Sequence, residues 1–303
     1  MKFTAITVGA LAGAAAVSAE SFCDKYSTAL FNSTDGAQQL TLLTLVVNSA
    51  LIGNYSNATS ANAPVKPTGI LTANGTFNGV NNINLLKYFD GSLLSTNRNG
   101  KAVSLNFLDG GGATPLKQNK AANDTKSNQH MLITHLYSYF GSLLGCSSVG
   151  KNGFPAYAGS TSQYDVHRFM NLNSAELGYF IQEVAYSAVS FGVSMEDIAP
   201  VGQALGTFFN NKCGAPLAVP SSASPAVQSV CLDPTCPVAG NSTCTASNSG
   251  TNGTDPAAAP GSSSSSGSGA SGSGTTASSA GKVASGVAGA LIAGAALAIA
   301  TLI

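Results

Sequence analysis

Histidines are the side chains best suited to hold a metal ion or to transfer a proton near neutral pH, and this chain contains three, His130, His135 and His167. His135 lies at the edge of an apolar stripe, one helical turn from Leu132 and Tyr139. A histidine in that position can ligate a metal, or it can be a partly buried residue bonded to a carbonyl. His130 lies off that face and is expected at the surface. Considered alone, His167 is expected to be a histidine of a turn or helix start without a ligand.

Other catalytic patterns are weak in this sequence. The glycine cluster Asp109–Gly112 is too short for a phosphate-binding loop and indicates a tight turn. No Gly-x-Ser-x-Gly elbow precedes a helix in the expected folded region, which argues against a serine hydrolase. Cys231, Cys236 and Cys244 have neither C-x-x-C spacing nor an accompanying histidine, so we expect structural cysteines rather than a metal site. Whether the chain is an enzyme is left open by the sequence.

The charge balance excludes one class of partner. Lysine and arginine together number 13, as do aspartate and glutamate, and only 9% of the residues are charged. Nucleic-acid binding requires a concentration of positive charge, and no basic patch is present. The sequence indicates no particular protein partner.

Four segments have the apolar periodicity of helices that would position these side chains. They are Gln38–Leu51, Ser127–Leu144, Ser174–Phe191 and a segment from Met195 or Glu196 to Phe209. Ser174 is the expected N-cap of the third helix. Between the first two helices, Tyr55–Lys126 is rich in Asn, Gly and Thr, and we expect loops and short helices there.

The order of several motifs resembles that of the truncated (two-over-two helical) haemoglobins. The motifs are Tyr88–Gly91, Phe140–Gly145, the Tyr-x-Gly of Tyr157–Gly159, His167, and the helix start Asn171–Leu177. The resemblance extends from Cys23 to Cys213 and implies an all-α, truncated-globin-like domain. The chain departs from the family where Leu51 replaces the usual distal tyrosine, where Cys146 replaces a glycine, and in an apparent insertion over 91–126.

The family resemblance implies that the domain binds haem. In such a domain His167 would be the proximal iron ligand and His135 the second axial ligand. The remaining side chains of the implied pocket are Phe89, Leu132, Leu136 and Phe140. A haem with both axial positions filled suits electron transfer, haem carriage, or gas and redox sensing better than oxygen storage. The expected ligands are therefore haem and, through it, a diatomic gas.

Composition divides the chain into five segments. Residues 1–19 have the basic start, apolar run and small-residue ending of a secretory signal peptide. The globin-like domain is expected over 20–213 and a Cys- and Pro-rich strap over 214–244. Residues 245–281 are a Ser/Gly-rich stretch that is expected to be a disordered stalk, and 282–303 are an apolar tail typical of a glycosylphosphatidylinositol (GPI) anchor signal.

The tail and the modification sites predict a cell-surface location. Small residues near its start make Ser278 the expected attachment residue, although an ordinary single membrane span is an alternative. The six cysteines indicate disulfides, with the pairing open. N-glycosylation is expected at seven sequons, Asn32, Asn54, Asn57, Asn74, Asn123, Asn241 and Asn252.

Two functional hypotheses follow from the sequence. The first is a GPI-anchored haem protein on the outer face of the plasma membrane or in the cell wall, with an anchor signal that resembles those of fungal surface proteins. The second is a structural or adhesion protein of the cell wall that has the same anchor and no cofactor. A haem protein needs His167 to face an apolar pocket near Phe89 and Phe140, whereas a structural protein needs only a filled core.

Overall fold

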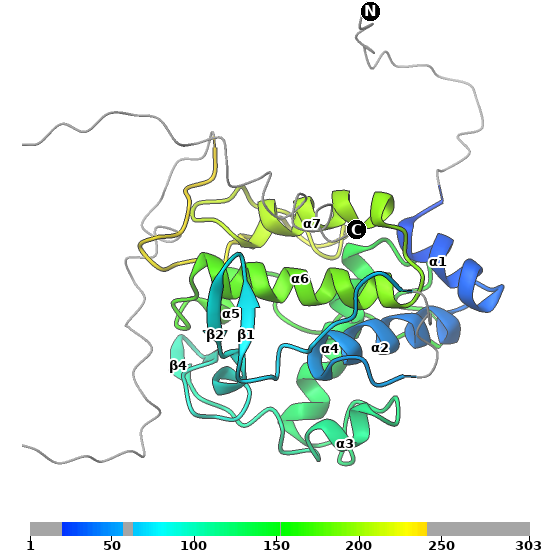
Figure 1. Ribbon diagram of the computed structural model, residues 1–303, viewed down its shortest axis with the longest axis horizontal. Coiled ribbons are helices and arrows are strands. Elements are labelled where there is room, and N and C mark those ends of the chain that lie inside the picture. The colour runs from blue at the N-terminus through cyan, green and yellow to red at the C-terminus, as the bar shows by residue number, and fades with distance from the viewer. Residues whose placement is uncertain (1–19, 57–62, 152, 241–303) are drawn as a thin grey trace, which may run out of the picture.

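The computed structural model describes residues 20–56, 63–151 and 153–240, which form a helical domain with two small hairpins (Figure 1). The α-helices of this part of the chain are α1 (Phe22–Phe31), α2 (Gly36–Ile52), α3 (Ala113–Leu116), α4 (Asn128–Leu143), α5 (Gln163–His167), α6 (Ser174–Ser190) and α7 (Met195–Phe209). The remaining elements are a 3-10 helix, η1 (Leu85–Tyr88), and the strands β1 (Gly75–Phe77), β2 (Val80–Ile83), β3 (Thr96–Arg98) and β4 (Lys101–Val103).

The long helices confirm the four helical segments predicted from the apolar periodicity of the sequence. The four predicted segments correspond to α2, α4, α6 and α7, with ends that differ by at most two residues. Helix α6 packs against both α2 and α7, and α4 packs against α2, so the core lies among these four helices. The predicted cap of α6 is wrong by one residue. Asn173 is the N-cap, and its side chain and that of Glu176 form a reciprocal capping box that satisfies free backbone N–H groups.

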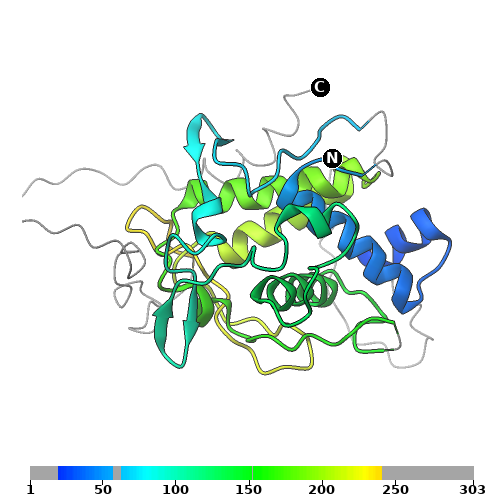
Figure 2. The same cartoon turned by 90° about the horizontal axis from the view of Figure 1, so that it is seen from below.

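The predicted all-α, truncated-globin-like fold class is wrong, because the domain contains two antiparallel two-stranded sheets, β1-β2 and β3-β4. Both hairpins turn at an Asn-Gly pair, Asn78-Gly79 and Asn99-Gly100, in which both residues have positive φ. Asn and Gly tolerate this backbone conformation, which matches the twist of paired strands. The predicted loops of this region are therefore partly strands. Both hairpins lie at the end of the domain opposite α1 (Figures 1 and 2).

The first hairpin rests on α6 through two close approaches between backbone and aromatic ring. A Cβ added at Gly178 on α6 would overlap the ring of Phe77 on β1. In the same way, a Cβ at Gly75 on β1 would overlap the ring of Tyr179 on α6. Each glycine therefore makes room for an aromatic ring of the other element. These contacts set the position of β2, because β2 pairs with β1.

A buried carboxylate holds the segment that connects α2 to the first hairpin. Glu183 on α6 is 1% exposed, and one of its oxygens accepts hydrogen bonds from the backbone N–H groups of Thr68 at 2.6 Å and Gly69 at 2.7 Å. The hydroxyl of Tyr179 donates to the carbonyl of Gly69 at 2.9 Å. Burial raises the pKa of Glu183, and the hydrogen bonds from Gly69 and Thr68 oppose that rise.

Disulfides link α1 to the segment after α4 and form a short loop in the strap. Cys23 on α1 is bonded to Cys146, which follows α4, and Cys231 is bonded to Cys236 in the strap. Cys213 is also disulfide-bonded. The expectation of structural cysteines is thus confirmed for Cys231 and Cys236. Among the helices of the described residues, none is long and apolar enough to cross a membrane.

We predict that Gly178→Ala destabilises the protein by about 1–3 kcal/mol, because the new methyl group must displace the Phe77 ring from a packed site. The matched control is Gly202→Ala on α7, where a Cβ meets no atom within 4 Å. Alanine has the higher helix propensity by about 1 kcal/mol, so the control variant should be as stable as the parent or more stable. Urea unfolding measures both, and equal effects of the two substitutions would contradict the packing argument.

We predict that Glu183→Gln is tolerated and that its effect depends on pH. The amide oxygen of Gln can accept both backbone hydrogen bonds, because a carbonyl oxygen has two lone pairs. The raised pKa of Glu183 means that the folded state favours the protonated acid. Protonated Glu183 therefore contributes to the free energy of unfolding below the unfolded pKa, and this contribution is lost as pH rises through the folded pKa. The free energy of unfolding of the variant relative to the parent should therefore be higher at about pH 7 than at about pH 4.

Glu183→Ala, compared with Glu183→Gln, tests the contribution of the hydrogen bonds to Thr68 and Gly69. It leaves the N–H groups of Thr68 and Gly69 without an acceptor, and the loss at the buried Gly69 donor alone costs about 1–3 kcal/mol. Alanine should therefore be the more damaging substitution at both pH values. Equal loss in the Gln and Ala variants would show that the carboxylate does not hold this segment.

Candidate functional site

The predicted proximal ligand His167 ends the short helix α5 and is half-buried. Its Nδ1 lies 2.9 Å from the carbonyl oxygen of Gln163. Because a carbonyl oxygen only accepts hydrogen bonds, Nδ1 carries the proton and Nε2 is the acceptor nitrogen of the ring. Burial lowers the pKa of His167, and the hydrogen bond to the Gln163 carbonyl raises it by less. The lowered pKa favours the neutral imidazole, and the hydrogen bond to Gln163 orients the ring on its own helix.

The predicted second ligand His135 lies on α4, and its ring packs against Tyr157. The two ring centroids are 5.8 Å apart, with the rings nearly perpendicular. Tyr157 in turn packs on Tyr139 with the centroids 5.2 Å apart, and its hydroxyl donates to the carbonyl of Ser160. Burial lowers the pKa of His135. This histidine thus belongs to an aromatic cluster.

The side chains predicted to form one haem pocket do not converge. Leu136 and Phe140 line an apolar cavity of about 50 Å³ among the core helices, but Phe89, Leu132 and the two histidines do not line it. Clefts that hold organic ligands have volumes of roughly 300–1,000 Å³. The cavity is therefore far too small for haem, and the arrangement of these six residues does not fit the group. Haem binding stays a prediction of the sequence that no contact in the described residues supports.

Metal binding by clustered side chains has no support in the described ranges either. No group of three or more His, Cys, Asp or Glu residues there is arranged to hold a metal ion. Cys231 and Cys236 are joined as a disulfide, so neither supplies a thiolate.

The predicted modification sites fall into two groups. Asn32, Asn54, Asn74 and Asn123 all have exposed side chains, as a glycan requires. The other predicted features lie outside the described residues: the signal peptide, Asn57, Asn241, Asn252, the stalk, Ser278 and the anchor tail.

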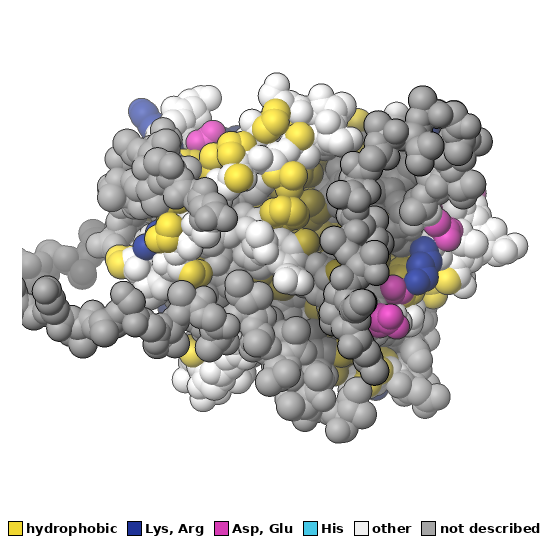
Figure 3. Space-filling model, turned by 90° about the horizontal axis from the view of Figure 1, so that it is seen from above, with side chains coloured by type: hydrophobic (Ala, Val, Ile, Leu, Met, Phe, Trp, Pro, Cys, Tyr) yellow, Lys and Arg dark blue, Asp and Glu magenta, His cyan; other side chains and the backbone are white. Residues whose placement is uncertain are grey.

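The outer face of α7 is a mixed surface. Hydrophobic side chains gather over the middle of the face shown in Figure 3, and charged side chains lie toward its edge. The fully exposed residues on this helix are nevertheless Glu196, Pro200, Gln203 and Thr207, so the apolar area is interrupted. Lys25 and Asp197 form a salt bridge of 2.6 Å that joins α1 to α7. We assign no site to this face.

A polar groove of about 310 Å³ lies between β2, η1 and the beginning of α6. Its walls carry amide and charged side chains together with a few apolar ones. The lining residues are Val80, Asn81, Asn82, Ile83, Asn84, Lys87, Tyr88, Leu93, Asn173, Ala175 and Glu176. The groove is therefore large enough for a small ligand and polar enough to select one by hydrogen bonds.

Several polar side chains of this groove form no hydrogen bond with the residues that the structure describes. The Oδ1 atom of Asn84 is buried and accepts no hydrogen bond. Asn84 precedes η1 without making a side-chain cap, so its amide has no structural role in that helix. Asn82 and Lys87 are exposed, and their side chains form no hydrogen bond within the described residues. These three side chains are available to a ligand.

The floor and inner wall of the groove are fixed. Tyr88 is buried, and its hydroxyl donates to the carbonyl of Met170 at 3.2 Å. Glu176 accepts from the backbone N–H of Asn173 at 2.9 Å, and the Asn173 side chain accepts from the N–H of Ala175. Burial raises the pKa of Tyr88, and burial also raises that of Glu176, with a smaller contribution from Asp233.

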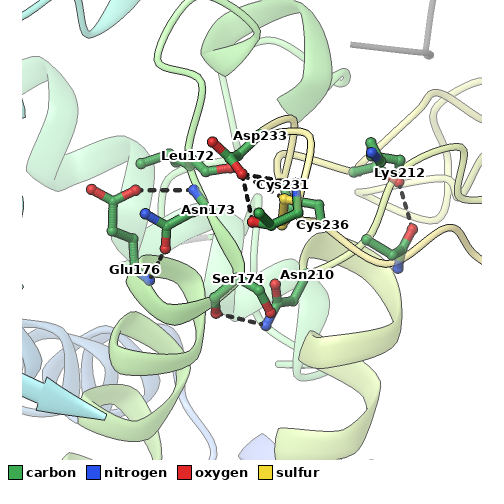
Figure 4. The surroundings of a disulfide bond; sticks show 12 residues. Leu172, Asn173, Ser174, Glu176, Asn210, Lys212, Cys231, Asp233 and Cys236 are labelled. Atoms are coloured by element: carbon green, nitrogen blue, oxygen red, sulfur yellow. Dashed lines mark hydrogen bonds between the residues drawn. A yellow bond between two sulfur atoms is a disulfide. The ribbon is translucent and has the colours of Figure 1, made fainter. Parts of the chain in front are cut away.

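The strap holds the start of α6 by hydrogen bonds beside the Cys231–Cys236 disulfide (Figure 4). The backbone N–H groups of Leu232 and Asp233, next to the Cys231–Cys236 disulfide, both donate to the carbonyl of Leu172. On the same helix start, the Asn210 amide donates to the carbonyl of Ser174 at 3.2 Å. The wall of the groove that α6 supplies is therefore anchored to a disulfide-bonded segment.

Sequence reasoning missed this groove. The run Asn78–Asn84 contains four asparagines, but an Asn-rich run alone predicts only a turn or loop and does not indicate a binding groove. The groove exists because the hairpin brings this run beside the start of α6, some 90 residues further along the chain. The first sequence signal that could have located it is the Asn78-Gly79 turn.

The chain matches no protein-family model, no curated protein and no solved structure. Neither the haem hypothesis nor the groove therefore gains support from a relative.

We predict that haemin titration of the full chain gives no saturable Soret shift, because the side chains of the implied pocket do not enclose a haem-sized space. The visible absorption spectrum measures this directly. His167→Ala and His135→Ala are the control variants, and both should give the same titration as the parent. A sharp Soret band that is lost in His167→Ala would contradict the prediction and establish a haem site.

Proposed function

We propose that this chain is a non-catalytic surface protein of the adhesion class, which recognises a partner through the groove between β2, η1 and α6. The observation that carries the proposal is the contrast between two hollows. The apolar one, of about 50 Å³, is too small for a ligand and contains none of the histidines, whereas the polar one, of about 310 Å³, is open and has unpartnered side chains.

An extracellular location is supported by the disulfides. Cys23–Cys146 and Cys231–Cys236 indicate an oxidising environment, such as the secretory pathway or the cell exterior. The signal peptide, stalk and anchor that the sequence predicts would place the domain at a distance from the membrane, attached by lipid at or near Ser278. This arrangement suits a protein that presents a binding surface to the outside.

The rigidity of the domain also suits recognition. Both walls of the groove are held by other parts of the domain: β2 through its partner strand β1, which packs on α6, and the start of α6 by the strap. A groove that is already formed loses little conformational entropy when a ligand binds. Haem or gas binding, the other function predicted from the sequence, would instead require the aromatic cluster around His135 to open.

We predict that cells displaying the full chain attach to other cells or to coated surfaces several-fold more than control cells do. The control displays only the signal peptide, stalk and anchor tail, so that the domain over 20–244 is the single difference. Attachment is counted after washing on surfaces coated with cells, protein or polysaccharide. No gain on any surface would contradict an adhesion function.

A further inference from the structure

We infer that the groove between β2, η1 and α6 binds a neutral oligosaccharide through the amides of Asn82 and Asn84 and the ammonium group of Lys87. This inference rests on the proposed function and names its ligand class. Five observations support it: the amide chemistry, the unpartnered acceptor, the balance of charge, the apolar patches and the size of the groove.

The amide side chains match the hydrogen-bonding pattern of sugar hydroxyls. An asparagine amide presents one acceptor oxygen and two donor hydrogens in one plane, and each sugar hydroxyl offers one donor and two acceptor lone pairs. Asn81 and Asn82 lie on β2, Asn84 directly follows its last residue, and all three line the same groove. The Asn81 oxygen is already bonded to the Thr76 hydroxyl, at 3.2 Å. Asn82 and Asn84 remain for the ligand.

The buried oxygen of Asn84 calls for a donor from outside the chain. Its Oδ1 is shielded from solvent and accepts no hydrogen bond. A buried acceptor without a partner costs about 1–3 kcal/mol. The described residues contain four such buried side-chain atoms, in Ser49, Asn84, Arg168 and Asn210, and of these residues only Asn84 lines the groove. A ligand hydroxyl reaching into the groove would supply the missing donor. The ligand must therefore carry hydroxyl or N–H groups, which excludes a purely apolar molecule.

The charges of the groove favour a neutral ligand over an anionic one. Lys87 and Glu176 both line it, so its formal charges cancel. Phosphate and carboxylate ligands are usually held by several cationic donors, and no second lysine or arginine lines this groove. Lys87 forms no salt bridge within the described residues, where Lys25–Asp197 is the one present, so its ammonium group can donate to hydroxyl oxygens. The charge pattern thus fits an uncharged, polar ligand.

Apolar patches and size complete the match to a sugar. Val80 is 48% exposed and Leu93 is half-buried, so both can contact the C–H groups on one face of a sugar ring. The volume of about 310 Å³ lies at the lower end of the range for ligand clefts, roughly 300–1,000 Å³. We therefore expect the groove to hold about one or two sugar rings of a longer chain.

Two sources can supply such a ligand. One is a polysaccharide outside the chain, and the other is an N-linked glycan of this protein. Asn74, an exposed sequon, directly precedes β1, the strand that pairs with β2 beside the groove. The shared chemistry is a neutral hexose or N-acetylhexosamine chain, and the experiment separates the two sources by removing the N-glycans first.

The test measures binding of fluorescent oligosaccharides to cells that display the full chain. The probes are oligomers of mannose, of β-linked glucose and of N-acetylglucosamine, with an oligogalacturonate as the acidic comparison. We expect saturable binding of at least one neutral probe and none of the acidic one. Binding to untreated cells indicates an external polysaccharide, and binding that emerges only after endoglycosidase treatment indicates that the protein's own glycans fill the groove. Either result supports the inference.

Two variants connect binding to the groove. Asn84→Leu removes the amide at similar volume and should lower affinity at least tenfold, while the melting temperature stays equal or rises because an unpaired buried acceptor is gone. Lys87→Ala should lower affinity about threefold or more through loss of a charge-assisted hydrogen bond. Its matched control is Lys66→Ala, an exposed lysine outside the groove, which should bind like the parent.

Several outcomes would overturn the inference. They are the absence of saturable binding by every neutral probe before and after deglycosylation, preferential binding of the acidic probe, and unchanged affinity in both Asn84→Leu and Lys87→Ala. These outcomes are separable from failure of the proposed function. Cells that attach without binding any saccharide refute the ligand class alone, whereas cells that neither attach nor bind refute both.

Discussion

The close approach of β1 to α6 is the constraint on which the rest of the structure depends. Helix α6 is covered by α2, α7 and the first hairpin, and the hairpin reaches it only because position 178 has no side chain to exclude the ring of Phe77. A glycine inside a helix costs about 1 kcal/mol relative to alanine, so its presence reflects packing rather than helix propensity. Once β1 is seated, the pairing of β2, the path of the segment bound by Glu183, and the position of the groove all follow.

Most of the fold that could be predicted from the sequence was predicted from local patterns of residues. The four long helices have apolar periodicity and side-chain caps within one segment, so their bounds were predictable to within two residues. The hairpins were missed, although Asn78-Gly79 and Asn99-Gly100 are the usual residues for such turns. Strands of three or four residues contain too few positions to show alternation, so the turn was the only local signal.

The candidate site depended on relations between distant segments, which a motif order does not determine. His135 and Phe140 lie on one helix, yet His135 meets Tyr157 from the segment before α5, while Phe140 faces the core cavity. A resemblance in the order of motifs predicted that these side chains share a pocket, and the packing of the intervening segments separates them. The groove illustrates the same limit, because Asn84 and Glu176 are neighbours only after the hairpin has docked on α6.

The Asn84 side chain forms no hydrogen bond within the described residues, which distinguishes it from the amides that hold the domain together. Gln228 accepts from Tyr139 and donates to the backbone carbonyls of Leu217 and Ala226 in the strap, and Asn48 bonds both Tyr137 and the carbonyl of Leu116. Those amides stabilise the fold, and apolar replacements would leave their partners unsatisfied. Asn84 has no such partner to lose. A buried polar group that weakens the isolated domain is the kind of local inconsistency that natural sequences keep at sites of function, where a ligand can supply the missing partner.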